Sequence, residues 1–328
     1  MKKRAIGLIA LLLCLAAAGR AQTPAPLTLE AKIPLGSVKG RIGHLAIDLE
    51  RQRLLVAELG NNSLGVVDLG RGAVVQRVTG LKQPQGVAYL PRLDLVLVAN
   101  AGDGTVRLFK GSDLAAAGRI DLADDADNVR IDRDDGRVYV GYGKGGIAII
   151  DPERGARIAD IALKVHPESF QIEPGSGRIF ANLPNAEQVA VIDGGAARQI
   201  AAWPLRGARA NFPMALDPDR ARLLIMARQP PRLIAYSTRD GGIVYSAPAC
   251  GDSDDLFVDA KRRRLYVSCG EGVVDIYQDK ESGYERLARL TTVSGARTAL
   301  FVPERDRLYV AVRARDKEPA SIWVFRPN

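Results

Sequence analysis

The chain has 328 residues, of which 47% are hydrophobic and 26% charged, so its composition is that of a folded globular protein and excludes disorder as its main state. Aromatic residues make up 5% of the chain whereas 33 residues are glycine, a balance that favours short strands and tight turns over long helices. The formal net charge of +8 falls to +4 without the N-terminal segment described next, because 42 basic residues then stand against 38 acidic ones.

The first 21 residues have the order of segments found in a secretory signal peptide. Residues 2–4 are basic, residues 5–18 form an apolar run, and small residues occupy Gly19 and Ala21. Because the run is shorter than the about 20 apolar residues that span a bilayer, and no second run follows, we expect no transmembrane segment. We expect cleavage after Ala21, a periplasmic or secreted location, and a single mature domain over residues 22–328.

A unit of nearly constant length repeats along the rest of the chain. Each unit has an apolar stretch, a turn of about five residues with an arginine near its end, and an alternating strand. Successive turns are separated by 42, 42, 41, 44, 42 and 44 residues, which fits a unit of four short strands. The turns start at Asp48, Leu90, Asp132, Glu173, Asp217, Asp259 and Pro303.

The second and third strands of each unit can be placed directly, because the second strands are runs of β-branched and aromatic residues that favour extended backbone. We expect second strands at residues 54–56, 96–98, 138–140, 179–181, 223–225, 265–267 and 308–310. We expect third strands at residues 64–68, 105–109, 147–151, 189–193, 233–236, 273–277 and 321–325. A fourth strand follows in every unit except the last.

The two ends of the repeat region complement one another. The seventh unit ends three residues after Phe325 and lacks a fourth strand, whereas residues 27–33 form a strand-like stretch with no unit of its own. Pairing of this N-terminal strand with the last unit would close a ring and protect its edges. The sequence therefore predicts an all-β, seven-bladed β-propeller of four-stranded blades, in which the N-terminal strand completes the last blade.

Four segments carry a resemblance to a known family. They are the second-strand motif at residues 96–100 (VLVAN) and the segments 166–171 (HPESFQ), 211–217 (NFPMALD) and 251–257 (GDSDDLF). With them, residues 27–325 resemble the YVTN-repeat, YncE-like propellers that bacteria export, in a largely uncharacterised branch. The resemblance implies the propeller fold and an exported location, but little about activity, because propellers host binding, scaffolding and several chemistries.

The loops that link one unit to the next are candidates for a binding site. Because strands alternate in direction, these loops share a face with the loops between second and third strands, and they surround the axis. The opposite face carries repeated Asp and Arg turns, which turn chemistry alone explains. A depression lined by convergent polar groups is the usual form of a small-molecule site, although such side chains can also cap strand ends or bind only water. The candidate ligand-binding residues are His44, Asp127, Asn128, His166, Glu168, Asn211, Asp254, Asp255 and Arg297.

Two kinds of function are compatible with this set. The first is a monomeric, non-enzymatic binding or scaffolding module, without a cofactor, that holds a small polar ligand or a partner protein. The second is a metal-assisted, lactonase-like hydrolase, since carboxylates and histidines could hold a divalent metal. No ligand spacing is diagnostic, however, and His44 stands where gluconolactonase-type propellers carry a glutamate. Single-stranded DNA binding, implied only by the YncE resemblance, needs a basic groove with stacking aromatics, so we do not expect nucleic acid as a partner.

Two cysteines, Cys250 and Cys269, remain once cleavage has removed Cys14. An even number of cysteines in an oxidising compartment indicates a disulfide. Hairpin registry places Asp254, and not Cys250, opposite Cys269, so the intervening loop must fold back for the sulfur atoms to meet.

Overall fold

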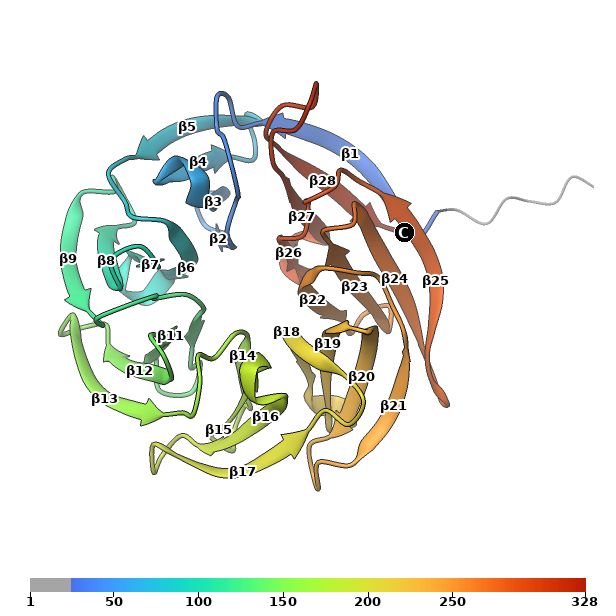
Figure 1. Cartoon of the computed structure of the whole chain (residues 1–328). Coiled ribbons are helices and arrows are strands. Elements are labelled where there is room, and N and C mark those ends of the chain that lie inside the picture. The colour runs from blue at the N-terminus through green and yellow to red at the C-terminus, as the bar shows by residue number, and fades with distance from the viewer. Residues whose placement is uncertain (1–24) are drawn as a thin grey trace, which may run out of the picture.

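Seven four-stranded antiparallel sheets are arranged around a central axis (Figure 1). The computed structural model describes residues 25–328, so the predicted signal peptide and its cleavage site lie outside the described residues. We number the sheets as blades one to seven in chain order. The innermost strands are β2 (Leu45–Asp48), β6 (Pro84–Leu90), β10 (Val129–Ile131), β14 (Phe170–Ile172), β18 (Arg209–Asp217), β22 (Ser253–Asp259) and β26 (Ala299–Val302).

The other strands of each blade follow outward from the axis. The second strands are β3 (Arg53–Glu58), β7 (Leu95–Asn100), β11 (Val138–Tyr142), β15 (Arg178–Leu183), β19 (Arg222–Gln229), β23 (Arg264–Cys269) and β27 (Arg307–Val312). The third strands are β4 (Ser63–Asp68), β8 (Thr105–Lys110), β12 (Gly146–Asp151), β16 (Gln188–Asp193), β20 (Pro231–Ser237), β24 (Val273–Lys280) and β28 (Ser321–Pro327). The outermost strands are β5 (Ala73–Val78), β9 (Ala116–Asp121), β13 (Ala156–Ala162), β17 (Arg198–Pro204), β21 (Ile243–Pro248), β25 (Gly283–Thr291) and β1 (Leu27–Pro34).

The N-terminal strand β1 closes the ring by pairing antiparallel with β28, the third strand of blade seven. The register runs from Leu27 opposite Pro327 to Pro34 opposite Ser321. Ile33 is only 4% exposed, so β1 contributes to the core as well as to the ladder. The predicted seven-bladed propeller and its closure are confirmed, as are the positions of the second and third strands.

Some of the turns between strands contain short 3₁₀ helices, and their sequences favour this conformation. Three of them, between the first and second strands, begin with a proline whose restricted φ suits the first helical position. The residue after each of the five helices adopts a left-handed conformation that ends it. The helices are η1 (Leu59–Asn61), η2 (Pro91–Leu93), η3 (Pro184–Ala186), η4 (Pro218–Arg220) and η5 (Pro303–Arg305).

The apolar core lies in the seams between neighbouring blades. In the seam of blades one and two, for example, Leu55 and Val66 pack in one cluster with Val87 and Val98. The other six seams hold similar clusters of buried residues. Because the seams supply the hydrophobic stabilisation, the space around the axis is free to carry polar groups.

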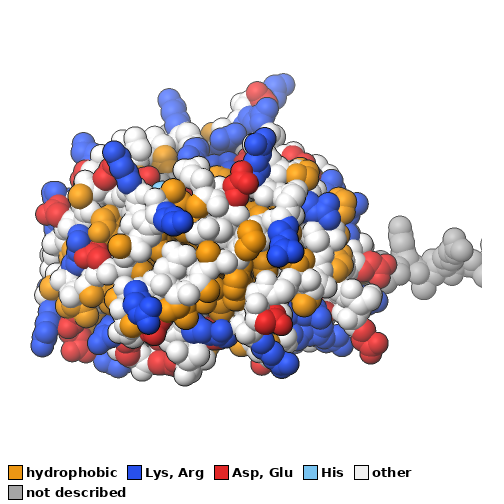
Figure 2. Space-filling view, turned by 60° about the horizontal axis from the view of Figure 1, so that its bottom comes forward, with side chains coloured by type: hydrophobic (Ala, Val, Ile, Leu, Met, Phe, Trp, Pro, Cys, Tyr) orange, Lys and Arg blue, Asp and Glu red, His pale blue; other side chains and the backbone are white. Residues whose placement is uncertain are grey.

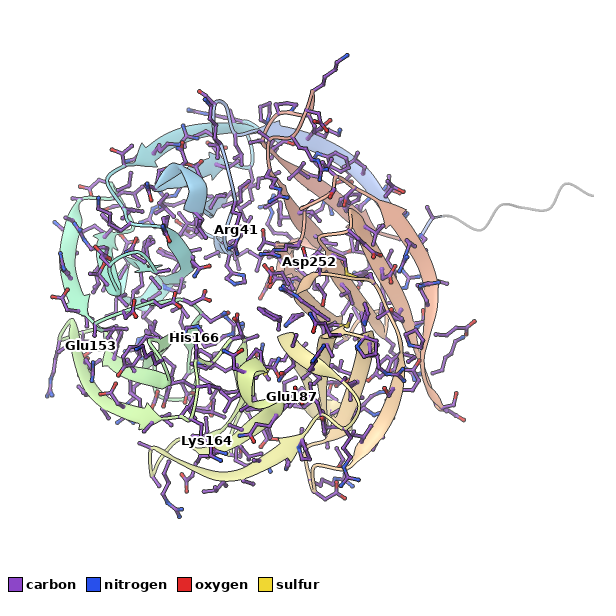
Figure 3. All side chains as sticks on the ribbon, in the orientation of Figure 1. Arg41, Glu153, Lys164, His166, Glu187 and Asp252 are labelled. Atoms are coloured by element: carbon purple, nitrogen blue, oxygen red, sulfur yellow. A yellow bond between two sulfur atoms is a disulfide. The ribbon has the colours of Figure 1, made fainter. Side chains whose placement is uncertain are left out.

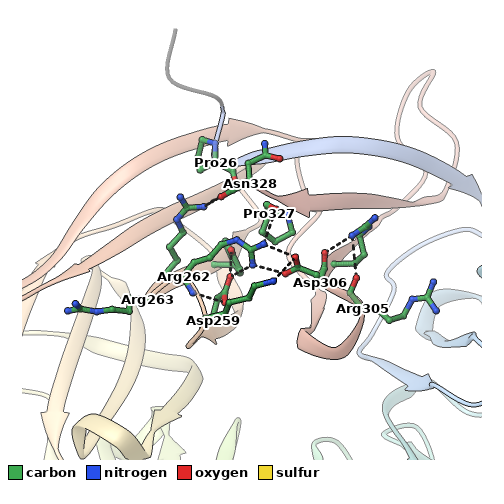
Figure 4. Close-up of polar contacts among 12 residues, drawn as sticks. Pro26, Asp259, Arg262, Arg263, Arg305, Asp306, Pro327 and Asn328 are labelled. Atoms are coloured by element: carbon green, nitrogen blue, oxygen red, sulfur yellow. Dashed lines mark hydrogen bonds and ion pairs between the residues drawn. The ribbon is translucent and has the colours of Figure 1, made fainter. Parts of the chain in front are cut away.

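Ion pairs join neighbouring blades on the face that carries the turns between first and second strands. Arg262 of blade six contacts Asp259 of its own turn at 3.2 Å and forms a two-point pair with Asp306 of blade seven, at 2.6 Å for each nitrogen (Figure 4). Arg51 of blade one contacts Asp94 of blade two in the same way, at 2.9 and 3.2 Å. These Asp and Arg side chains therefore hold the ring together.

Charged side chains are dispersed over the outer surface. Figure 2 shows Lys and Arg side chains among acidic and apolar ones on the side that it displays, without a single basic patch. Within residues 25–328, no helix is long and apolar enough to cross a membrane.

Candidate functional site

The loops that link neighbouring blades share one face with the loops between second and third strands, as predicted. Leu81, between β5 and β6, donates its backbone N–H to the carbonyl oxygen of Asn62, between β3 and β4, at 3.0 Å. Figure 3 shows His166 and Asp252, which belong to two linking loops, close to the central opening. We call this face the linking face.

A bulge in β22 shapes the axial end of blade six. Ser253 pairs with Cys269, and Asp255 pairs with Ser268, so Asp254 has no partner in the ladder. The predicted registry, which placed Asp254 opposite Cys269, is wrong by one residue because of this bulge. β6 and β18 have register shifts in the corresponding region. Bulges re-aim side chains, and here they alter three of the strands that approach the axis.

A disulfide joins Cys250 and Cys269 in the structure, with Cα atoms 6.1 Å apart. Cys250 precedes β22 and Cys269 ends β23, so the loop between Cys250 and Ser253 folds back as the sequence requires. The bond anchors the linking loop that carries Asp252 beside the axis.

His44, just before blade one, and Asp255 of blade six form a pair beside the start of blade seven. His44 Nδ1 lies 3.5 Å from one Asp255 oxygen, and the other oxygen accepts the backbone N–H of Ala299 at 2.8 Å. Burial lowers the pKa of His44, but the carboxylates of Asp255, Asp127 and Asp254 outweigh it and raise the pKa to about 9. The imidazole is therefore protonated at neutral pH.

Two arginines hold the bulged residue Asp254. Arg228 Nη2 lies 2.6 Å from one of its oxygens, and Arg297 Nε lies 3.1 Å from the other. Arg297 also pairs with Asp252 at 2.7 Å, and the Arg228 guanidinium lies over the Phe212 ring, 3.6 Å from its centre. Burial raises the pKa of Asp254, although both arginines oppose this effect. Asp252 and Phe212 therefore help to hold the two arginines in place around Asp254.

Asp127 and Glu168 are acidic groups without such partners. Asp127 is 7% exposed, and its Oδ1 has no hydrogen-bond partner. Burial raises the pKa of Asp127 despite the opposing charges of His44 and His166. Burial also raises the pKa of Glu168, together with the charges of Asp127 and Asp254, to about 7. Each of the two acids therefore makes ionisation of the other less favourable.

A cavity of about 470 Å³ extends along the axis, and all seven blades line it. Arg130, at the start of β10, is a partly buried cation in its wall. Its guanidinium donates to the carbonyl oxygen of Val129 at 2.9 Å and to Ser169 Oγ at 3.3 Å. The cavity therefore has a fixed cation along its wall. Lining residues from blades one to seven include His44, Gly86, Val129, Ser169, Met214, Asp255 and Ala299.

Most of the predicted residues converge on this region. We define the axial cluster as His44, Asp127, Arg130, Glu168, Arg228, Asp254, Asp255 and Arg297, which are linked by the contacts and mutual charge effects given above. His166 lies at its edge: Nδ1 is 2.6 Å from the Gly143 carbonyl oxygen, and its charge influences Asp127 and Glu168.

Two of the predicted residues have other surroundings. Asn211 donates through Nδ2 to Asn182 Oδ1 at 2.7 Å and to the Gln188 carbonyl oxygen at 3.0 Å, both in blade four. It therefore joins blades four and five. Asn128 is 3% exposed, and its Oδ1 has no hydrogen-bond partner.

Sequence reasoning missed Arg130 and Arg228, because only residues of the linking loops were considered. Arg228 lies near the end of β19, where a second strand reaches the linking face. The alternation of strand direction would have placed it there. Arg130 lies within β10, and no signal in the sequence showed that its side chain would enter the cavity.

Metal ligation was also considered. Within residues 25–328, no group of three or more His, Cys, Asp or Glu side chains is placed to hold a metal ion. In the axial cluster, Asp254 and Asp255 are already engaged by Arg228, Arg297 and His44. The described residues therefore present no preformed metal-ligand set.

Comparisons with known proteins identify the fold. No family model matches the chain, and no curated protein matches it. A chain of the Kuenenia stuttgartiensis hydrazine synthase structure is similar with a TM-score of 0.75 and 18% identity, over 84% of this chain and 94% of that one. A chain of the mitotic checkpoint complex crystal structure is similar with a TM-score of 0.77 and 13% identity, over 98% of each chain. At such identities the similarity shows a shared propeller fold alone.

Proposed function

We propose that this protein is an exported, non-enzymatic binding module that holds a small polar ligand in the axial cavity of its linking face. The observation that carries the proposal is the convergence of buried and partly buried charged side chains from different blades around one cavity, which His44, Arg130 and Asp255 line. Burying charge is costly unless it is paired. Because the blade seams supply the hydrophobic stabilisation, the charges at the axis are better explained by recognition than by folding.

The size and depth of the site favour a small ligand over the flat surface of a protein. A cavity of about 470 Å³ lies within the usual range for small-molecule sites. The side chains of His44 and Asp255 are only 23% and 14% exposed. A partner protein could reach them only by inserting a side chain or a chain end.

The exported location rests on the sequence. Residues 1–21 have the signal-peptide pattern, and segments such as 166–171 and 251–257 resemble exported YncE-like propellers. The disulfide between Cys250 and Cys269 is compatible with an oxidising compartment. These observations all support export to an oxidising compartment, and none of them depends on which ligand the protein binds.

A hydrolase is the second candidate, and Glu168 is the residue that favours it. A carboxyl with a pKa of about 7 can exchange a proton at neutral pH, as a general acid or base must. The lactonase-like mechanism would also need a metal, for which residues 25–328 present no three-residue ligand group. The binding module therefore has the stronger support.

Ligand-observed NMR with a library of small polar compounds, lactones included, tests the proposal. The variant Glu168→Gln is compared with Glu187→Gln, which changes an exposed carboxylate in the β15–β16 loop on the same face. We expect compounds that bind the wild type and Glu187→Gln but bind Glu168→Gln at least about tenfold more weakly. Equal binding to both variants would contradict the proposed site, and lactone hydrolysis lost only in Glu168→Gln would favour the enzyme.

A further inference from the structure

Part of the axial cluster, together with Asp252 beside it, is already neutral without a ligand. The carboxylates of Asp252 and Asp254 are shared between Arg228 and Arg297, with nitrogen to oxygen distances of 2.6 to 3.4 Å. Two negative and two positive groups therefore compensate each other.

Two histidine pairs extend this compensation. Protonated His44 lies 3.5 Å from Asp255. At the edge of the cluster, His166 lies 3.8 Å from Asp125, whose side chain is 46% exposed. These groups require no external partner.

Three charged groups remain, and they are of both signs. Within residues 25–328, no oppositely charged side chain lies within 4.0 Å of Asp127, Glu168 or Arg130. Asp127 is more than nine-tenths buried and has an oxygen without a hydrogen-bond partner. It lies two residues before β10, and its charge raises the pKa of both His44 and Glu168.

We infer that the ligand is a small zwitterion carrying an ammonium group and a carboxylate, of the size of an amino acid or a dipeptide. This inference rests on the proposed binding function. The ammonium group donates hydrogen bonds to Asp127 and Glu168, and the ligand carboxylate accepts them from Arg130. An anion alone would leave the two acids without a partner, and a cation alone would leave Arg130 without one.

The three groups come from the same end of two neighbouring blades. Asp127 lies two residues before β10, Arg130 is the second residue of β10, and Glu168 lies two residues before β14. The guanidinium carries five N–H donors, and its contacts with Val129 and Ser169 leave others for a ligand. Arg130 lines the cavity of about 470 Å³, and Asp127 and Glu168 lie within two residues of its lining residues Val129 and Ser169.

Matched derivatives separate the contributions of the two charges. Titration calorimetry and ligand-observed NMR are run with alanine, leucine, glutamine, lysine and the dipeptide alanylalanine at millimolar concentration. Each compound is compared with its C-terminal amide, which lacks the carboxylate, and with its N-acetyl derivative, which lacks the ammonium group. We expect at least one zwitterion to bind, and both of its derivatives to bind at least about tenfold more weakly.

Two variants connect each charge to its partner. Asp127→Asn should weaken binding of the zwitterion and the amide but not of the N-acetyl compound, whereas Arg130→Gln should weaken binding of the zwitterion and the N-acetyl compound but not of the amide. Asp125→Asn is the control for the first, because it makes the same change in the same loop at a half-exposed position. Arg137→Gln, on the opposite face of the same blade, is the control for the second. If Arg130→Gln fails to fold, binding of the amide and N-acetyl derivatives and the Asp127→Asn variant still test the inference.

The inference is overturned if no zwitterion of the set binds, or if a zwitterion and its two derivatives bind equally well. Should another polar compound bind in a way that depends on Glu168, the proposed axial site stands and only the ligand class is wrong. Should no compound depend on Glu168, the proposed function fails as well.

Discussion

The dependence of stability on pH gives a direct test of the charged groups at the axis. The pKa of His44 rises from 6.5 to about 9, since nearby carboxylates outweigh the effect of burial. A group whose pKa is higher in the folded state stabilises that state fully below its unfolded pKa, and this stabilisation is lost as the pH rises through the folded pKa. At 1.36 kcal/mol per pKa unit, His44 contributes about 3 kcal/mol below pH 6.5, which is lost by about pH 9.

Glu168 acts in the same direction over a lower range. Its pKa rises from 4.5 to about 7, so the folded state binds this proton more tightly than the unfolded state does. The associated stabilisation, again of about 3 kcal/mol, is present below pH 4.5 and lost as the pH rises to about 7. The two groups together make the protein progressively less stable as the pH rises from 4.5 to 9.

Urea unfolding across this pH range measures the effect. The free energy of unfolding of the wild type, relative to His44→Gln, should fall by about 3 kcal/mol from about pH 6 to about pH 9.5. The chain has two histidines, so His166→Gln assigns their NMR signals and the pKa of His44 can be read directly. A stability difference that does not change with pH, or a titration of His44 near 6.5, would refute the electrostatic argument.

Three further changes test the fold and the site. Deletion of residues 28–34 should unfold or aggregate the protein because blade seven loses its outer strand; an unchanged melting temperature would contradict ring closure. The protein without residues 1–21, unfolded and unreduced, should show no free thiol, whereas two thiols would exclude a bond between Cys250 and Cys269. Asp254→Ala should cost about 2 kcal/mol because it removes charge-assisted contacts to two partly buried arginines, which then keep only Asp252, and Asp132→Ala about 1 kcal/mol from a lost turn hydrogen bond; denaturant titrations showing equal losses would contradict this contrast.

The fold could be predicted almost completely from the sequence, because each blade repeats the same local pattern. Runs such as residues 54–56 and 138–140 are β-branched or aromatic and lie in second strands. The closing strand was predictable from what was missing, since the last unit lacked one strand and residues 27–33 supplied one. The register at Cys269 was not predictable, because a bulge at Asp254 depends on packing that the hairpin pattern does not contain.

The site was only partly predictable. Topology alone placed His44, Glu168 and Asp254 near the axis, since each precedes or begins an innermost strand. The partners of these side chains come from other blades, so their pairing depends on the relative rotation of blades and not on local sequence. For the same reason the sequence alone does not show that two arginines hold Asp254. A loop carboxylate without such partners would tolerate alanine at a cost of about 0.5 kcal/mol or less.

The two faces of the propeller show why the axial charges point to a ligand. On the face of the first turns, Asp48 accepts from Arg51 and Arg53 of its own turn, and Arg51 reaches Asp94 of the next blade. Each of these charges is neutralised within the chain, and the arrangement links neighbouring blades. At the axis of the other face, the side chain of Asp127 is buried, and one of its oxygens has no hydrogen-bond partner. Since an unpartnered buried carboxylate destabilises the fold, its presence is best explained by a donor that arrives from outside the chain.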